Sequence, residues 1–360
     1  EAGVERAQTI LDSKLRLATD SASGMASAAF GGLIPVSVSN ANSEVEEIRI
    51  ERFVVHNWQL NPRMSLESTL KYETSEIKQS GDVTKSKTLT FPKPRVALAY
   101  EVAPSTQLRA RLERTVGQLN FEDFAASGDF SAGTINVGNS NLEPERAWVS
   151  ELAWEQRFWG KGALVVTATH SAVESVTDVI PIFSGTSVFD APGNLGNGTK
   201  DELNANLTVP FDNLGLKGLD LRVNYLWRRT RVKDPTTGEM RPFSSLNPWE
   251  GSFTITQDLP RLKSTFVINA QNLGAMSRQY RSNETRFDYT TPNYVNIQYN
   301  WRPNPKLVVT LQLVENLFSR ERRRERVIYA GPRSLGVVNI SEERSAEMEP
   351  FVMFRIRKTL

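Results

Sequence analysis

Cysteine is absent from the 360 residues, so disulfide bonds and thiolate chemistry are excluded. Histidine is scarce: only 2 are present, His56 and His170, and neither has nearby ligands or partners at the spacing of a metal or catalytic site. No apolar run reaches the length of about 18 residues that a transmembrane helix needs. The 43 basic and 41 acidic residues almost cancel, which gives no reason to expect a nucleic-acid partner. No catalytic residue, metal or cofactor is therefore predicted.

What the chain has in quantity is alternation of apolar and polar residues. In LDLRVNYLW (219–227), Leu219, Leu221 and Val223 point one way and the polar residues between them point the other way. Strands with this period have one apolar and one polar face. Helical periodicity is scarce, so we predict an all-β chain. The same pattern recurs in RVALAYEV (95–102), TQLRARLER (106–114), KDELNANLTVP (200–210), LKSTFVINA (262–270) and YVNIQYNW (294–301).

The connections between these segments alternate in length, which predicts about fourteen strands with short turns at one rim and long loops at the other. This asymmetry is typical of outer-membrane barrels, and a soluble β-sandwich does not require it. The fold predicted is therefore a transmembrane antiparallel β-barrel. The short turns are expected at 60–64, 103–106, 159–162, 210–218, 258–262 and 302–306. The long loops are expected at 21–44, 79–88, 117–145, 181–198, 233–247, 278–286 and 318–347.

The tryptophans provide a second indication of a membrane. Trp58, Trp159 and Trp301 lie beside short turns. A further three lie near the long-loop ends of their strands, namely Trp148, Trp227 and Trp249, and only Trp154 is in the middle of a strand. We interpret the six as aromatic residues at the two membrane interfaces; ordinary core aromatics are the alternative. The apolar faces would then contact lipid, and the opposite faces would form a polar interior with Lys71, Glu73, Arg109, Arg111, Glu151, Glu155 and Arg222.

One segment, 46–60, conflicts with this pattern because Arg52 and His56 share a face with Ile48, Ile50 and Val54. A cation on the lipid face at mid-membrane costs about 2–4 kcal/mol. Either a β-bulge near Arg52 that exchanges the faces, or a position close to the outer rim, would remove the conflict.

Two long loops contain candidate ligand-contacting residues. The segment SRERRRERVIYAGPR (319–333) is expected to be an extracellular loop. Its residues Arg320, Arg322, Arg323 and Arg324 would contact an anionic ligand or lipopolysaccharide phosphates. The alternative is a solvated loop that also contains Glu321 and Glu325. In FEDFAASGDF, the residues Phe121, Phe124 and Phe130 would line a ligand entrance or pack within their own loop.

Three segments resemble TonB-dependent outer-membrane receptors. In NSNLEPERAWVSELAWEQRF (139–158), a loop runs into a strand; Ser140 and Ala153 replace the family's usual Pro and Gly. LQLVENLFSRERRR (311–324) is similar to a late strand of these barrels. The C-terminal PFVMFRIRKTL looks like their terminal strand, although Leu360 stands where members usually have an aromatic residue. The matching residues are Asn139, Asn141, Leu142, Pro144, Glu145, Glu151, Asn316, Leu317 and Phe318.

The resemblance implies a barrel of about twenty-two strands with an N-terminal plug. Residues 1–360 would then be the C-terminal portion of the barrel, without the plug. The remaining strands and the plug would come from an N-terminal part of the protein or from a second chain. By resemblance, such a receptor lies in the bacterial outer membrane, among lipid and lipopolysaccharide. It binds a scarce solute such as a siderophore, cobalamin or an oligosaccharide, and imports it through the TonB energy-coupling complex. The alternatives are a self-closed passive pore of about fourteen strands and a structural or adhesive surface protein, while an enzyme is the least expected class.

Overall fold

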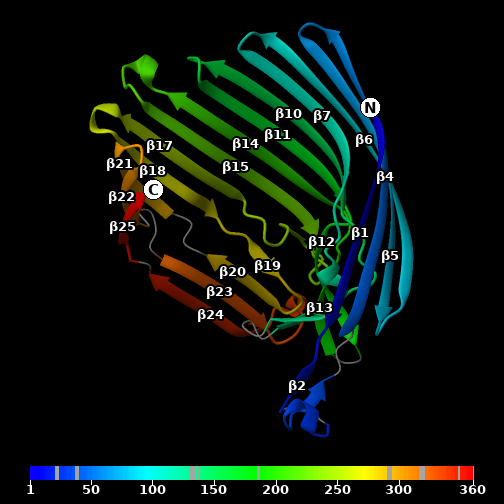
Figure 1. Cartoon of the computed structure of the whole chain (residues 1–360). Coiled ribbons are helices and arrows are strands. Elements are labelled where there is room, and N and C mark those ends of the chain that lie inside the picture. Colours follow the sequence, from blue (N-terminus) through cyan, green and yellow to red (C-terminus); the bar gives the residue numbers. More distant parts are fainter. Residues whose placement is uncertain are drawn as a thin grey trace.

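A computed structural model shows one large, curved, antiparallel sheet that resembles part of a cylinder wall (Figure 1). It describes residues 1–20, 24–36, 40–129, 134–136, 138–184, 187–289, 294–315, 321–347 and 349–359. Within these residues, fourteen strands form a continuous path in which each strand pairs with the next in chain order. The prediction of about fourteen antiparallel strands is confirmed. No helix in the described part of the chain is long and apolar enough to cross a membrane.

The strands of the path are β1 (Ala2–Lys14), β4 (Asn42–Asn61), β5 (Met64–Gly81), β6 (Lys85–Ala103), β7 (Thr106–Val116), β10 (Arg146–Phe158), β11 (Gly162–Glu174), β14 (Gly198–Pro210), β15 (Leu219–Lys233), β17 (Trp249–Leu259), β18 (Ser264–Ala275), β21 (Tyr294–Asn304), β22 (Leu307–Glu315) and β25 (Phe351–Lys358). β1 and β25 lie at the two ends of the path, and no pairing joins them among the described residues. Within the described residues, the sheet therefore has two free edges.

All six predicted short turns connect neighbouring strands, and they lie together at one end of the sheet (Figure 1). Two of them use an asparagine side chain in the same way. Asn61 Oδ1 accepts the N–H of Arg63 at 2.9 Å, and Asn304 Oδ1 accepts the N–H of Lys306 at 3.0 Å. Such local bonds stabilise tight turns. The β14–β15 turn contains the short 3₁₀ helix η3 (Asp212–Leu214), and the β17–β18 turn contains η4 (Pro260–Leu262).

The predicted long loops lie at the other end of the sheet, and all but one of these connections are long. The 79–88 segment is a tight turn, because β5 and β6 extend to Gly81 and Lys85. Several other long connections form strands of their own. β12 (Thr177–Ser184), β13 (Ser187–Asn194), β9 (Thr134–Asn136) and β8 (Ser127–Asp129) form one small sheet, and β19 (Arg278–Tyr280), β20 (Glu284–Tyr289), β23 (Glu321–Tyr329) and β24 (Val338–Glu347) form another. The remaining elements are β2 (Leu17–Thr19), β3 (Ile34–Val36), β16 (Met240–Arg241), η1 (Ala28–Phe30), η2 (Phe121–Phe124) and η5 (Arg333–Leu335).

The register places apolar residues directly opposite one another on the outward face. One such line, called the apolar row below, starts at Trp58 near the β4–β5 turn and ends at Trp227, well away from the β14–β15 turn. Each member is the cross-strand partner of the next. The row consists of Trp58, Leu66, Leu98, Ala110, Leu152, Ala168, Leu203 and Trp227.

The length of the apolar row matches the thickness of a membrane. Its seven steps between strands, at ~4.8 Å each, span ~34 Å across the sheet. Barrel strands tilt by about 35–45°, so the row rises by about 19–24 Å along the membrane normal. The lipid-facing band of an outer-membrane barrel is about 25 Å tall. The two tryptophans at its ends, Trp58 and Trp227, are therefore separated along the normal by about the height of that band. This geometry supports the interface assignment of these two tryptophans.

The conflict at Arg52 is not removed by a bulge. The β4–β5 register is continuous from Ser43 to Gln59, and it shifts only between Gln59 and Asn61. Arg52 is exposed on the outward face and is the cross-strand partner of Tyr72. It lies six residues from Trp58, which is about 14–16 Å higher along a tilted strand. The expected bulge is therefore wrong. Arg52 lies in the outer half of the band, where a long side chain can extend towards the headgroups.

Candidate lumenal and extracellular site

The inward face of β4, β5 and β6 is held together by paired charges. Lys71 Nζ lies 2.7 Å from Glu51, and Lys93 Nζ bonds both Glu51 and Glu73, the latter at 2.7 Å. Glu51 and Glu73 are only 7% and 4% exposed. A buried carboxylate is tolerated when a cation compensates its charge. The two lysines therefore compensate the charges of both glutamates on this wall.

The same kind of pairing continues across the following strands. Arg111 on β7 lies 2.8 Å from Glu113 and 2.6 Å from Glu151, its neighbour on β10. Further along the sheet, Arg228 lies 2.7 Å from Glu202. The inward face is therefore an extended set of cross-strand ion pairs. This is the polar interior that the sequence predicted, and it suits contact with water or with a polar protein segment better than contact with lipid.

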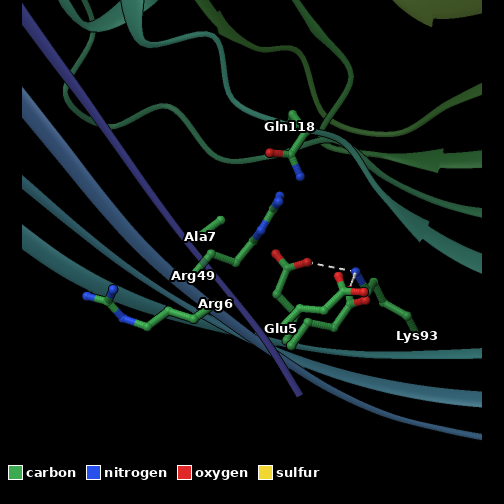
Figure 2. Close-up of a pocket in the computed structure, with 8 residues that line it drawn as sticks. Glu5, Arg6, Ala7, Arg49, Lys93 and Gln118 are labelled. Carbon is green, nitrogen blue, oxygen red and sulfur yellow. Dashed lines mark hydrogen bonds and ion pairs between the residues drawn. The ribbon is translucent and has the colours of Figure 1, made fainter. Parts of the chain in front are cut away.

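Figure 2 shows a cavity of about 490 Å³ on this wall, next to the ion pairs of Lys93. Glu5, Arg49 and Gln118 also line it, so its surface offers both acceptors and charged donors. Arg49 extends towards Gln118, whereas Arg6 points away from the other labelled side chains. The volume is within the range of small-molecule sites, which is about 300–1,000 Å³. The cavity could hold a polar solute or a polar segment of protein.

A second charged cluster joins the long loops at the extracellular end. Asp234 follows β15, and its side chain is only 1% exposed. It lies 2.7 Å from Arg241 Nε and 2.6 Å from Arg333 Nη2, and it also accepts the backbone N–H groups of Thr236 at 2.8 Å and Thr237 at 2.9 Å. One carboxylate therefore fixes its own turn and two guanidinium groups.

The two arginines extend this cluster to further loops. Arg241 Nη1 lies 2.9 Å from Asp178 of β12, and its guanidinium group lies 4.5 Å from the ring centre of Tyr280 in β19. Arg333 of η5 lies 5.5 Å from the same ring. We call Asp178, Asp234, Arg241, Tyr280 and Arg333 the loop hub. It ties together four long connections that lie far apart in the sequence.

The ionisation of Asp234 explains how the hub is held. Burial alone would raise the pKa of this carboxyl group. The bonds from Arg333, Thr237 and Thr236 outweigh that effect and lower its pKa to about 2. Asp234 is therefore ionised at any physiological pH, and the two arginines keep their charged partner.

The 139–158 segment connects the loops to β10 through buried polar contacts. Asn139 Nδ2 donates to the carbonyl of Pro192 at 2.9 Å, and Leu142 is 1% exposed within an apolar cluster. Burial raises the pKa of Glu145, whose carboxylate accepts the N–H of Thr177 at 3.4 Å. The residues that resemble the receptor motif therefore have a structural role in positioning the loop against the strand.

The predicted aromatic ligand contacts are not placed for that role. Phe121 is 8% and Phe124 is 1% exposed, and both pack with Val45, Ile77 and Leu142. Because their rings are buried against β4, β5 and the neighbouring loop, packing replaces the predicted ligand entrance for these two residues. Phe130 lies outside the described residues.

Three arginines of the predicted cluster, Arg322, Arg323 and Arg324, lie in strand β23. Arg323 lies 2.8 Å from Glu325 and 3.0 Å from Glu343 on β24. Arg324 also has an interaction partner. Arg320 and the side chain of Arg322 lie outside the described part. Since Arg323 and Arg324 already have partners, the arrangement favours the solvated alternative over a free cationic patch.

All six predicted interface tryptophans are exposed, between 37% and 57%. Trp159 and Trp301 lie beside short turns as Trp58 does, while Trp148 lies 5.7 Å from the guanidinium group of Arg114. Trp249 is the cross-strand partner of Trp227 at the long-loop end. Their contact with the membrane interface stays a prediction.

Sequence analysis missed a partner of His170. Its Nδ1 lies 2.6 Å from Asp201 on the outward face, and Ser150 is its cross-strand neighbour on the other side. No hydrogen bond joins Ser150 to His170 among the described residues. The surrounding backbone N–H groups belong to strands paired on both sides, so they are not available as oxyanion donors. Among the described residues, the side chains of Ser150, His170 and Asp201 therefore do not form a hydrogen-bonded triad. The described residues also contain no group of three or more acidic or histidine side chains placed to hold a metal ion.

The sheet is curved and antiparallel, with an apolar outward face and a charged inward face. Its connections are short turns at one rim and mostly long loops at the other. These features together define the wall of a membrane-spanning β-barrel. Residues 9–317 match the family model described as "TonB dependent receptor-like, beta-barrel". The chain therefore belongs to the TonB-dependent receptor β-barrel family, whose members lie in the outer membrane of Gram-negative bacteria. The recognition from the sequence motifs is confirmed. No curated protein matches the chain.

Solved structures with the same fold are distant in sequence. The siderophore receptor PiuA from Acinetobacter baumannii is 14% identical, with a TM-score of 0.59 over 91% of this chain and 44% of that one. The ferric-catecholate import receptor Fiu from Escherichia coli K12 is 12% identical, with a TM-score of 0.60 over 91% and 47%. A variant of the ferric enterobactin receptor PfeA from Pseudomonas aeruginosa is 11% identical, with a TM-score of 0.55 over 99% and 60%. The chain thus spans about half the length of the structures that it matches.

Proposed function

We propose that this chain is the C-terminal barrel portion of a TonB-dependent transporter that binds a scarce solute at the cell surface and imports it by energy coupling. The observation that supports this best is the charged inward wall in a sheet that has two free edges. Lipid cannot satisfy an unpaired strand edge. Further strands would complete the barrel, and a polar plug would face the ion pairs around Glu51 and Arg111.

The partners in this proposal are N-terminal barrel strands, a plug domain and the TonB energy-coupling complex, which acts through the plug. The solute would be a siderophore, cobalamin or an oligosaccharide. Because the similar structures named above are receptors for siderophores or ferric complexes, ferric siderophores are the first class to test. The loop hub would form part of the surface that the solute meets before it reaches the lumen.

Uptake by cells that have or lack the gene tests this function. Uptake of a labelled ferric siderophore, cobalamin or oligosaccharide should require the gene, and a protonophore that collapses the proton-motive force should abolish it. Uptake that needs the gene but continues with the protonophore would contradict energy coupling and favour a passive pore. Conductance of the protein purified from the outer membrane gives an independent measurement, because a plugged transporter should not form an open channel in a planar bilayer.

A further inference from the structure

The outward face of β15 changes its chemistry abruptly at Trp227. Up to that residue, its outward side chains are the apolar or aromatic Leu219, Leu221, Val223 and Tyr225. The next outward residues are Arg229, Arg231 and Lys233, and all of them are exposed. We call these three residues the cationic column. Within the described part of the chain, none of the three side chains has a hydrogen bond or an ion pair.

The residues between them show that this exposure belongs to one face only. Thr230, Val232 and Asp234 alternate with the cationic column and are all buried, at 7%, 0% and 2% exposure. Val232 packs in an apolar cluster with Val176 and Phe243, and Asp234 anchors the loop hub. The strand is therefore held firmly on its inner side, and the cations project from its outer side.

The height of the column follows from the position of Trp227 at the upper end of the apolar row. Arg229 and Arg231 lie about 5 Å and 10 Å beyond the tryptophan along the membrane normal, given ~3.3 Å per residue and a tilt near 40°. The headgroup layer on each side of a bilayer is about 5–7 Å thick. The two guanidinium groups therefore lie at the level of the outer headgroups or just beyond them, and Lys233 lies further out.

Two other outward-facing cations near this rim are neutralised by a carboxylate. Arg114 lies 3.0 Å and Arg146 3.5 Å from Glu174. Among the described cross-strand partners of the column, the one carboxylate is Asp201, opposite Arg229, and it is bonded to His170 at 2.6 Å. Three positive charges thus lie beside a single carboxylate that already has another partner. The positive charge of the column is therefore not compensated within the described residues.

We propose that the cationic column binds the phosphate groups of lipopolysaccharide in the outer leaflet. Lipid is what contacts this face of the barrel directly below the column, and phosphate oxygens are strong acceptors for guanidinium groups. Outward residues on a strand are spaced by ~6.6 Å, so the column spans ~13 Å and suits a headgroup with more than one phosphate. The inference depends only on the orientation of the barrel in the membrane, so it does not depend on which solute is transported.

Titration of the detergent-purified protein with diphosphorylated lipid A tests the inference. Near an anionic surface each Lys or Arg strengthens binding by about fivefold, so the triple variant Arg229→Gln, Arg231→Gln, Lys233→Gln should bind about 100-fold more weakly. The control Lys217→Gln, Arg261→Gln, Arg302→Gln removes the same charge from exposed positions at the short-turn rim and should bind like the wild type. Arg229→Lys with Arg231→Lys keeps the charge and should retain most of the binding.

Three results would overturn the inference: equal binding by the triple variant and the rim control, equal binding of fully dephosphorylated lipid A by the wild type, or displacement of lipid A by low concentrations of inorganic phosphate. Thermal unfolding of each variant verifies that the exposed substitutions leave the fold intact.

Discussion

The apolar row predicts how the cost of a charge depends on depth in the membrane. Ala110 and Leu152 occupy the middle of the row, about 10 Å from either boundary, whereas Leu66 and Leu203 lie one strand step, or ~3 Å, from its ends. Arginine on the lipid face costs about 2–4 kcal/mol at the midplane and about 0–1 kcal/mol near the interface. Relative to alanine at the same position, arginine should therefore destabilise by about 2–4 kcal/mol at Ala110 and Leu152, and by about 1 kcal/mol or less at Leu66 and Leu203.

Urea unfolding of the protein in phospholipid vesicles, followed by tryptophan fluorescence, gives these differences in the free energy of unfolding. Thr169 provides a matched control, because it lies on the inward face beside Glu151 and Glu202. Arginine there should cost little or stabilise, since it gains carboxylate neighbours in a polar lumen. A profile that is flat along the row, or one in which the end positions cost more than the middle ones, would refute the assignment of the row to the membrane.

The loops make two further predictions. Asp234→Asn should destabilise the extracellular end by about 3–5 kcal/mol, because the buried guanidinium group of Arg333 loses its carboxylate and that of Arg241 keeps only Asp178. Faster hydrogen exchange in β12 and β19 should report this loss. Folding lowers the pKa of Asp234 from 3.8 to about 2. The contribution of Asp234 to stability is therefore complete above pH 3.8 and is lost as the pH falls to 2. Wild-type loops should accordingly resist proteolysis equally at about pH 7 and about pH 5. Phe124→Ala should cost about 3–5 kcal/mol in an unfolding titration, whereas Leu214→Ala, at a residue 59% exposed, should change stability by less than about 0.5 kcal/mol.

The barrel strands and turns could be predicted because their signals are local. Alternation over a few residues identifies a strand with two different faces, and residues such as Asn61 and Asn304 stabilise a tight turn within their own neighbourhood. The 79–88 segment was predicted incorrectly for a physical reason. Its polar composition is typical of a loop, but β5 and β6 continue as a paired ribbon beyond the membrane, where no lipid requires an apolar face.

The loop hub could not be predicted, because its contacts join residues far apart in the chain. Asp234 and Arg333 are separated by 99 positions, and Asp178 and Arg241 by 63. A single sequence contains many Asp and Arg residues and gives no sign of which pairs meet. His170 and Asp201 illustrate the same limit, since their contact depends on the register of β11 against β14. The phenylalanines of η2 were recognised as notable, but their burial depends on packing against β4 and β5.

Cysteine scanning along β15 tests the membrane boundary directly, and because residues 1–360 contain no native cysteine, each variant has one thiol within them. Two changes coincide near residue 228: the outward face turns from apolar to cationic, and the inward face turns from lumenal to buried under the loops. In lipid vesicles, Val223→Cys should be protected from a membrane-impermeant thiol reagent, and Arg231→Cys should react readily. Val232→Cys should be protected in vesicles and in detergent alike, because protein and not lipid covers it. Detergent should not change the reactivity of Arg231→Cys, since that side chain already lies outside the apolar layer. Equal reactivity of the thiols at 223 and 231 in vesicles would mean that Trp227 does not mark the outer boundary.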